Sequence, residues 1–294
     1  MLEFGTKLGE VMQLNSFDDL NGKVCVLTGG GGVLGAVLAK SLASAGVKLA
    51  ILDIKKEYAE KVASEVRSDY KTEAISVEAN VLDKTSLSDA KKIILQNFTK
   101  VDILINGAGG NSPKATTKDE FISDDNINSL EDTFFGLEME GFQKVFDLNF
   151  LGTLLPTMVF AQEMVERKSG VILNVSSMNS FRSLTKIPAY SAAKASINNF
   201  TEWLAVHFAK MNVRVNAIAP GFFLTNQNRF LLIDENTSEL TARGKKIIDN
   251  TPMNKFGQPE DLVGATLFLL SDLSKFMTGV VLPIDGGFNI YSGV

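Results

Sequence analysis

Short apolar runs alternate with longer amphipathic stretches along most of this chain. The short runs are rich in Val and Ile and apolar on both faces, which is typical of strands covered by helices on both sides. We expect strands at residues 24–28, 47–53, 74–79, 101–106, 170–176, 213–219 and 280–284, and helices at residues 34–46, 55–69, 84–99, 141–167, 189–211 and 259–271. Such alternation requires crossover connections, so the sequence predicts one doubly wound α/β domain with a seven-stranded parallel sheet and helices on both faces.

Three segments lie outside this alternation. Residues 1–20 precede the first strand, and we expect them to form an N-terminal arm on a single catalytic domain that spans residues 21–294. Residues 107–140 and 222–257 are long connections, which in compact domains are usually functional or disordered. The second one follows the sixth strand at its carboxyl end, where doubly wound sheets bind ligands, so we expect residues 222–257 to form a substrate lid.

Composition narrows the class of protein. The 294 residues are 45% hydrophobic and 21% charged, which excludes disorder for most of the chain, and the net charge of −5 argues against nucleic-acid partners. A single cysteine, Cys25, and a single histidine, His207, exclude an internal disulfide and clustered Cys or His metal sites, so we expect no metal. No apolar stretch is long enough to span a membrane and no secretory signal is recognised, so we expect a cytoplasmic protein with a small-molecule substrate.

A glycine-rich turn follows the first expected strand, with glycines at 29–32 and at Gly35. Glycines let the backbone approach a pyrophosphate, and the helix that follows supplies N–H donors and a favourable dipole. Asp53 stands 18 positions beyond Gly35, at the end of the second strand. There it would accept both hydroxyls of an adenosine ribose and repel a 2′-phosphate, which predicts NAD rather than NADP. A plain structural turn, with Asp53 as a helix N-cap, is the alternative.

Tyr190 and Lys194 stand four residues apart at the start of an expected helix, so they share one face. The alternative is a solvated helix face with no chemical role. A free tyrosine has a pKa near 10, so a tyrosine that transfers protons near neutral pH needs a lower value. A neighbouring ammonium and an oxidised nicotinamide are perturbations of the right sign.

At these residues the chain resembles the short-chain dehydrogenase/reductase family, from about residue 17 to the C-terminus. Six motifs occur in the family's order: the glycine turn, the Asn106–Gly109 segment, Asn149 in FDLNFLG, Ser177 in NVSS, the Tyr190/Lys194 pair, and the Pro220-Gly221 turn with Thr225. The resemblance implies a Rossmann-type domain that transfers hydride between a nicotinamide and a carbonyl or alcohol carbon.

The resemblance also implies a role for each catalytic residue. Tyr190 would be the general acid/base, Ser177 would hydrogen-bond the substrate oxygen, Lys194 would lower the tyrosine pKa and bind the nicotinamide ribose, and Asn149 would hold a water that links Lys194 to solvent. Besides Tyr190 and Lys194, the residues expected to bind NAD are Gly29, Gly31, Gly32, Val33, Leu34, Gly35, Asp53, Asn80, Val81, Asn106, Ala108, Gly109, Pro220, Gly221, Phe223 and Thr225.

The chain departs from the family pattern at three positions. Val33 replaces the usual small residue of the glycine turn, Gly107 replaces the second asparagine of its motif, and Asn80 stands where an aspartate often contacts adenine. None of these changes removes a group from the reaction centre, so they bear on cofactor affinity.

The segments TGGGGVLG, NGAGGNSPKATT, SSMNSFRSLTKIPAYSAAK, LAVHFAK and APGFFLTNQNRF are similar to those of the bacterial D-mannonate oxidoreductase (fructuronate reductase) branch of the family. This resemblance implies a sugar-acid substrate. A carboxylate needs a cation and a polyol needs hydrogen-bonding groups; the expected substrate residues are Asn111, Asn179, Arg182 and Arg229, with Lys114 and Lys186 as further candidates. A 3-oxoacyl carrier reductase or a polyol dehydrogenase would share every catalytic residue. A catalytically silent nucleotide sensor is a third possibility, but it would not need the four catalytic groups.

The remaining residues are predicted to be structural. His207 is expected to be a structural residue in the middle of a helix, and Cys25 a strand residue that packs in the core. The family resemblance implies that the helices at 141–167 and 189–211 pack against symmetry mates, which predicts a homotetramer.

Overall fold

The computed structural model describes residues 17–225, 228–235 and 237–293. Seven strands form one all-parallel sheet in the order β3-β2-β1-β4-β5-β6-β7, which confirms the predicted fold class. The strands are β1 (Val24–Thr28), β2 (Lys48–Asp53), β3 (Ala74–Glu78), β4 (Ile103–Asn106), β5 (Gly170–Val175), β6 (Val213–Pro220) and β7 (Val281–Ile284). The chain order reverses between β1 and β4, so a crevice for ligands is expected at the carboxyl ends of these strands.

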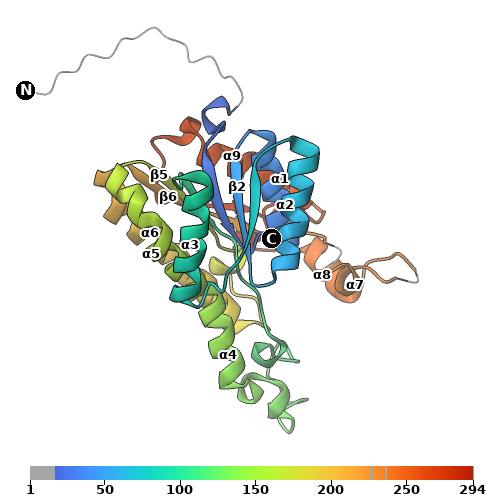
Figure 1. The fold of residues 1–294 in the computed structure, drawn as a ribbon. Helices are drawn as coiled ribbons and strands as arrows, with labels where there is room; N and C mark the ends of the chain where they lie inside the picture. The colour runs from blue at the N-terminus through green and yellow to red at the C-terminus, as the bar shows by residue number, and fades with distance from the viewer. Residues whose placement is uncertain (1–16, 226–227, 236, 294) are drawn as a thin grey trace, which may run out of the picture.

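Helices cover both faces of the sheet (Figure 1). One apolar core joins the sheet to α1 (Val33–Ser44), α2 (Lys56–Tyr70) and α9 (Val263–Leu270). The other joins it to α3 (Lys84–Phe98), α5 (Gly152–Arg167) and α6 (Pro188–Phe208). Because both faces are covered, the inner strands are apolar on both sides, as their sequences predict.

The helix expected over residues 141–167 is present as one continuous helical run, Met139–Arg167, with a π-helical turn inside it. The structure has α4 (Met139–Phe146), a π-helical turn at Asp147–Leu151, and then α5. Such turns inside helices often occur at functional sites, and this one contains Asn149. The combined stretch Met139–Arg167 is long and apolar enough to cross a membrane, but half of its most apolar window is buried inside the fold. We therefore interpret the stretch Met139–Arg167 as a core helix of the domain.

Two long connections project from the body of the domain in Figure 1. The first, residues 107–140, contains short 3₁₀ turns at Pro113–Ala115, Leu130–Asp132 and Phe134–Gly136; we call it the insert. The second carries α7 (Arg229–Leu232) and α8 (Ala242–Asp249), which the sequence analysis left within the expected lid. Residues 226, 227 and 236 of that expected lid lie outside the described residues.

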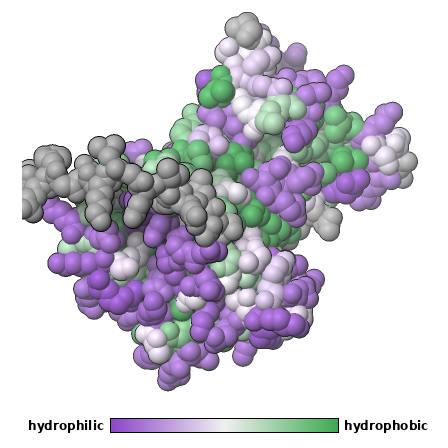
Figure 2. Space-filling model, turned by 90° about the horizontal axis from the view of Figure 1, so that it is seen from above, coloured by the Kyte–Doolittle hydropathy of each residue, from purple (hydrophilic) through white to green (hydrophobic). Residues whose placement is uncertain are grey.

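The predicted N-terminal arm lies mostly outside the described residues, since residues 1–16 are not among them. The last part of it, Asp18–Leu20, forms a 3₁₀ turn whose Leu20 side chain is fully buried in the core. That part therefore packs as an integral piece of the domain. On the face shown in Figure 2, hydrophilic surface predominates and apolar surface is broken into separate patches.

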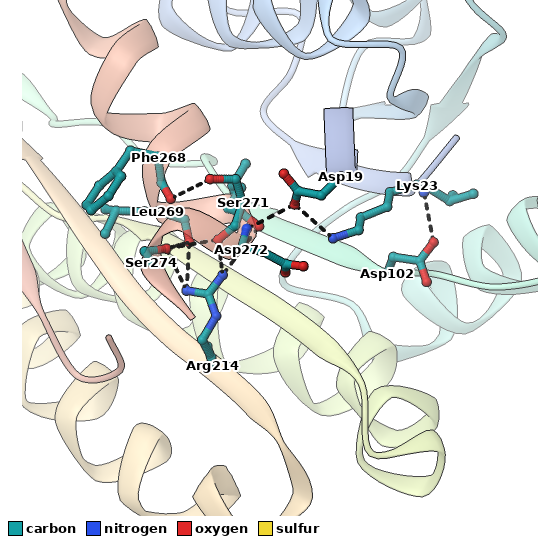
Figure 3. A network of polar contacts seen from close by, with 11 residues as sticks. Asp19, Lys23, Asp102, Arg214, Phe268, Leu269, Ser271, Asp272 and Ser274 are labelled. Carbon is teal, nitrogen blue, oxygen red and sulfur yellow. Dashed lines mark hydrogen bonds and ion pairs between the residues drawn. The ribbon is translucent and has the colours of Figure 1, made fainter. Parts of the chain in front are cut away.

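A network of polar contacts lies at the amino-terminal ends of the strands, on the side of the sheet opposite the expected ligand crevice (Figure 3). The guanidinium of Arg214, on β6, donates to the carbonyls of Leu269 (2.8 Å) and Ser271 (3.0 Å), just at and after the end of α9. Nearby, Asp19 accepts from the amide of Asp272 at 2.9 Å, which ties the first turn of the domain to the same region. Cations are favourable at helix C-termini, so Arg214 stabilises the end of α9.

Candidate active site

The glycine turn brings three backbone segments unusually close together. Gly29 has φ +64°, and a Cβ on Gly35 would lie 2.5 Å from the Gly29 carbonyl oxygen. A Cβ on Gly31 would lie 2.6 Å from the Tyr58 Cβ and 2.9 Å from the Asp53 carboxylate. Gly32 is the N-cap of α1 and provides no side-chain cap, so the first amides of that helix can donate to an anion. Val33 is accommodated as the first residue of α1.

Asp53 ends β2 and faces the glycine turn. Its Oδ2 accepts from the Gly31 amide at 3.2 Å and its Oδ1 from the Lys55 amide at 3.1 Å. The N-cap of α2 is Lys55, not Asp53, so the helix-cap alternative is wrong. A carboxylate can accept more than two hydrogen bonds, which leaves acceptor capacity at this end of the turn.

Tyr190 and Lys194 lie on the first turns of α6, and neither belongs to a solvated face. Lys194 is 3% exposed, and its Nζ donates to the Val175 carbonyl at 2.7 Å and lies 5.6 Å from the centre of the Tyr190 ring. Ser177, just beyond β5, lies close enough to the Tyr190 hydroxyl to lower the pKa of that tyrosine by hydrogen bonding. The structure therefore brings all three groups together, and the solvated-face alternative is wrong.

Burial dominates the titration of this pair. Desolvation raises the pKa of Tyr190, and the hydrogen bond from Ser177 opposes that shift. Desolvation also lowers the pKa of Lys194 to about 7. The low tyrosine pKa expected from the sequence is thus not produced by these side chains alone.

Asn149 is fully buried in the π-helical turn. Its Nδ2 donates to the carbonyls of Gly110 and Val145, both at 2.7 Å, and its Oδ1 accepts from the Gly110 amide at 3.3 Å. A Cβ on Gly109 would lie 2.7 Å from this Oδ1 and 3.3 Å from the Lys194 Nζ. The loop after β4 therefore contacts two of the four predicted catalytic residues, and only glycine fits at 109 without a shift.

The loop after β4 is also held by a residue that the sequence analysis did not single out. Thr28, the last residue of β1, accepts through Oγ1 from the amides of Gly107 (3.1 Å) and Ala108 (3.3 Å). A polar residue at the end of an otherwise apolar strand was the available signal. Asn106, predicted to bind cofactor, points its side chain into the core, where Nδ2 donates to Thr157 and Asn174.

The other predicted cofactor residues lie on the loops after β3 and β6. Asn80 is exposed and Val81 is buried against Gly152. Pro220 ends β6, and the Gly221 amide donates to the Ile284 carbonyl at 2.9 Å. Phe223 is buried beside Gly257, and the Thr225 amide donates to Asn228 at 2.8 Å. Their cofactor contacts remain predictions.

The predicted substrate residues are placed less uniformly. Asn179 is 6% exposed, and its Oδ1 has no hydrogen-bond partner within the described ranges. Asn111 donates to Thr116 at 3.0 Å, whereas Arg182 and Arg229 are exposed. Lys114 pairs with Glu138 at 2.9 Å, so its charge is already partnered.

The two single-copy residues lie away from these groups. Cys25 is buried in β1, and burial raises the pKa of its thiol. His207 is exposed on α6, where it stacks on Trp203 with ring centres 4.7 Å apart.

Known proteins share this architecture. Residues 32–289 match the family described as enoyl-(acyl carrier protein) reductase. The solved structure of a provisionally named D-mannonate oxidoreductase from Haemophilus influenza, with bound NAD, is 50% identical; the match covers 95% of this chain and 99% of that one, with a TM-score of 0.89.

More distant relatives have different substrates. A 3-oxoacyl-[acyl-carrier-protein] reductase of Aquifex aeolicus is 33% identical over 91% of this chain and 98% of its own length. A 2-dehydro-3-deoxy-D-gluconate 5-dehydrogenase of Dickeya dadantii is 32% identical over 94% of this chain and 99% of its own length. Substrate class therefore varies among relatives that retain about a third of these residues.

Proposed function

We propose a sugar-acid substrate and an NAD cofactor for this chain, which belongs to the short-chain dehydrogenase/reductase family. The reaction is hydride transfer between the nicotinamide and a carbonyl or secondary alcohol, with D-fructuronate and D-mannonate as the keto and alcohol forms. The observation that carries the proposal is the 50% identity, over nearly both full lengths, to the Haemophilus influenza protein solved with NAD.

The glycine turn fits a dinucleotide. The uncapped first amides of α1 can donate to the pyrophosphate, and glycines at 29, 31 and 35 keep side chains out of a space that a Cβ would fill. Asp53 retains acceptor capacity for the ribose hydroxyls and would repel a 2′-phosphate. When bound, the nicotinamide supplies or accepts the hydride.

The chain's own groups handle the proton and the substrate oxygen. Tyr190 protonates the developing alkoxide in reduction and removes the hydroxyl proton in oxidation. Ser177, which lies beside Tyr190, donates to the same substrate oxygen. In its charged form Lys194 favours the tyrosinate, as does the positive charge of an oxidised nicotinamide. Asn149 fixes the loop after β4 and holds a water that connects Lys194 to solvent.

Recognition of a sugar acid is assigned to Asn111, Asn179, Arg182 and Arg229. Asn179 lies two residues from Ser177, and its unpartnered Oδ1 suits a substrate hydroxyl. An arginine can bind a carboxylate through two parallel hydrogen bonds, so Arg229 is the proposed carboxylate ligand.

A substrate panel tests the proposal. The purified enzyme is assayed with D-fructuronate, acetoacetyl thioesters and xylitol or other polyols, each with NAD(H) and with NADP(H). We expect the highest kcat/KM with D-fructuronate and NADH. Preference for a thioester would favour the second candidate, a 3-oxoacyl carrier reductase, which the Aquifex aeolicus relative supports. If the enzyme turns over none of these compounds, the remaining alternative is a nucleotide sensor without catalytic activity.

The proposal includes a homotetramer in the cytoplasm. The exposed faces of α5 and α6 carry large apolar side chains, among them Met158, Trp203 and Val206 at 55%, 57% and 79% exposure. These are the two helices that the family resemblance assigns to subunit contacts.

A further inference from the structure

A short piece of the insert, residues 117–120, contacts the segment that leads into the catalytic helix. The Thr117 amide donates to the Lys186 carbonyl at 3.0 Å, and the Lys186 Nζ donates back to the Lys118 carbonyl. Lys186 stands four residues before Tyr190. These reciprocal bonds fix the insert against the chain that positions the catalytic tyrosine.

The base of the insert continues this contact into the site. Ala115 is fully buried in a small apolar cluster with Val145 of α4 and Ala189 of α6, and the Tyr190 ring packs against that cluster. The insert, through Ala115, therefore forms one wall of the apolar surroundings of the Tyr190 ring. Its position relative to α6 is set by both apolar packing and backbone hydrogen bonds.

The same piece of the insert reaches α8 on its other side. The Glu120 carboxylate forms an ion pair with the Lys246 ammonium across 126 residues of sequence. Lys186 and Arg243 add positive charge nearby, and together with the bond to Lys246 these cations lower the pKa of Glu120. Glu120 therefore stays ionised at neutral pH and keeps the pair intact.

The position of α8 is passed on to the loop after β6. The Thr241 hydroxyl, at the N-cap of α8, donates to the Leu231 carbonyl of α7 at 2.8 Å. The Arg229 amide, at the start of α7, donates to the Thr225 carbonyl at 2.9 Å. Contacts therefore run from Glu120 through α8 and α7 to Thr225, a residue expected to bind NAD.

We propose that Glu120 and Lys246 are positioning residues that brace α7 and α8 against the insert, and through them fix the cofactor loop relative to Tyr190. The proposal rests on the nicotinamide site of the proposed function but not on the identity of the substrate. The competing explanation is an exposed ion pair without consequence, since most surface pairs contribute little.

Hydrogen exchange of the full-length enzyme tests the brace without substrate. The variants are Glu120→Gln, Lys246→Met, the double variant, and Lys246→Arg, which retains the charge. Glu65→Gln is the matched control, because it removes the Lys40–Glu65 ion pair between α1 and α2, whose glutamate is 34% exposed against 32% for Glu120. Peptides covering 225–249 report the brace, and peptides of the sheet report global stability.

We expect each neutral single variant to speed exchange in α7 and α8 by roughly two- to fivefold, the range that corresponds to an exposed ion pair. The double variant should resemble either single variant, Lys246→Arg should resemble the wild type, and sheet peptides should not change. The dissociation constant for NADH, measured by its fluorescence, should rise by a similar factor.

Unchanged exchange in α7 and α8 of Glu120→Gln, or additive effects in the double variant, would overturn the brace. Faster exchange with unchanged NADH affinity would overturn its connection to the cofactor loop. A wild-type enzyme that does not bind NADH would instead refute the proposed function, and the exchange data would still decide whether the brace exists.

Discussion

Gly109 is a residue whose lack of a side chain is required by its neighbours. An added Cβ would lie 2.7 Å from the Asn149 Oδ1, and that carboxamide is held by three hydrogen bonds to main-chain groups. The backbone or Asn149 must then shift, which also disturbs Lys194. We expect Gly109→Ala to lower kcat at least tenfold while the melting temperature falls only slightly. A kcat within twofold of wild type would show that the loop yields without affecting the site.

Substitution of Arg229 tests whether the enzyme recognises a carboxylate on its substrate. Arg229 is exposed at the start of α7, so its guanidinium is accessible to a ligand. Losing a charged hydrogen bond costs about 1.5–3 kcal/mol, so Arg229→Ala should raise KM for D-fructuronate tenfold or more. Binding of NADH should hardly change. If Arg229 only pairs with a surface acid, KM stays unaltered, and much of the specific case for an acidic substrate is lost.

Lys194 makes stability depend on pH. Its pKa is about 7 in the folded chain, against 10.5 as its ordinary value, so between these pH values the unfolded state binds more protons. The free energy of unfolding contributed by this group therefore rises with pH over that window and is constant below it. We expect urea denaturation to show a smaller rise from pH 7 to pH 8.5 in Lys194→Met than in the wild type. Parallel curves would mean that Lys194 is charged at pH 8.5 in the folded protein.

At the scale of elements, the strands could be predicted from sequence. A short apolar run bounded by turn residues is typical of a strand that is covered by helices on both faces of a parallel sheet. The π-helical turn between α4 and α5 could not be predicted. Helical periodicity continues through Asp147–Leu151, and the π-helical turn is fixed by bonds from Asn149 to a loop 39 residues away. The short α7 was missed because four residues cannot establish a periodic pattern.

Arg214 shows what a single partly buried cation contributes to an element. Its guanidinium donates to Leu269, Ser271 and the Ser274 hydroxyl, and these bonds satisfy groups at the end of α9 and in the turn that follows (Figure 3). Replacing it with Met removes these charged hydrogen bonds, and among the described residues the carbonyls of Leu269 and Ser271 then accept only from Ser274. We expect Arg214→Met to lower the free energy of unfolding by about 2–3 kcal/mol in urea titrations. At a temperature where the variant is folded, kcat should match wild type; a large loss of kcat would mean that the effect reaches the opposite edge.

For the whole molecule, the convergence of the expected catalytic residues could be predicted because ordered motifs at the carboxyl ends of parallel strands meet at one edge of the sheet. Ser177, Tyr190 and Lys194 meet there as expected. The contacts of the two long connections could not be predicted, since Glu120 and Lys246 are 126 residues apart and nothing in their local sequence pairs them. The titration of Lys194 likewise depends on burial, which spacing alone does not reveal.

Assembly is the prediction that involves the whole molecule. A line of aromatic rings runs along α6, with Phe200 stacked on Trp203 and Trp203 stacked on His207. Large apolar side chains exposed together mark a protein interface, and two-fold packing is the usual solution for identical chains. We expect light scattering at micromolar protein to give the mass of four 31.9-kDa chains.

Trp203→Glu should reduce that mass, because it places a charge in the apolar contact. The same change at Phe121, which is 70% exposed on the insert, is the control and should leave the mass unchanged. A monomeric wild type would contradict the tetramer outright. A tetramer that tolerates Trp203→Glu but not Phe121→Glu would move the interface from α6 to the insert, where it would lie beside the wall of the Tyr190 site.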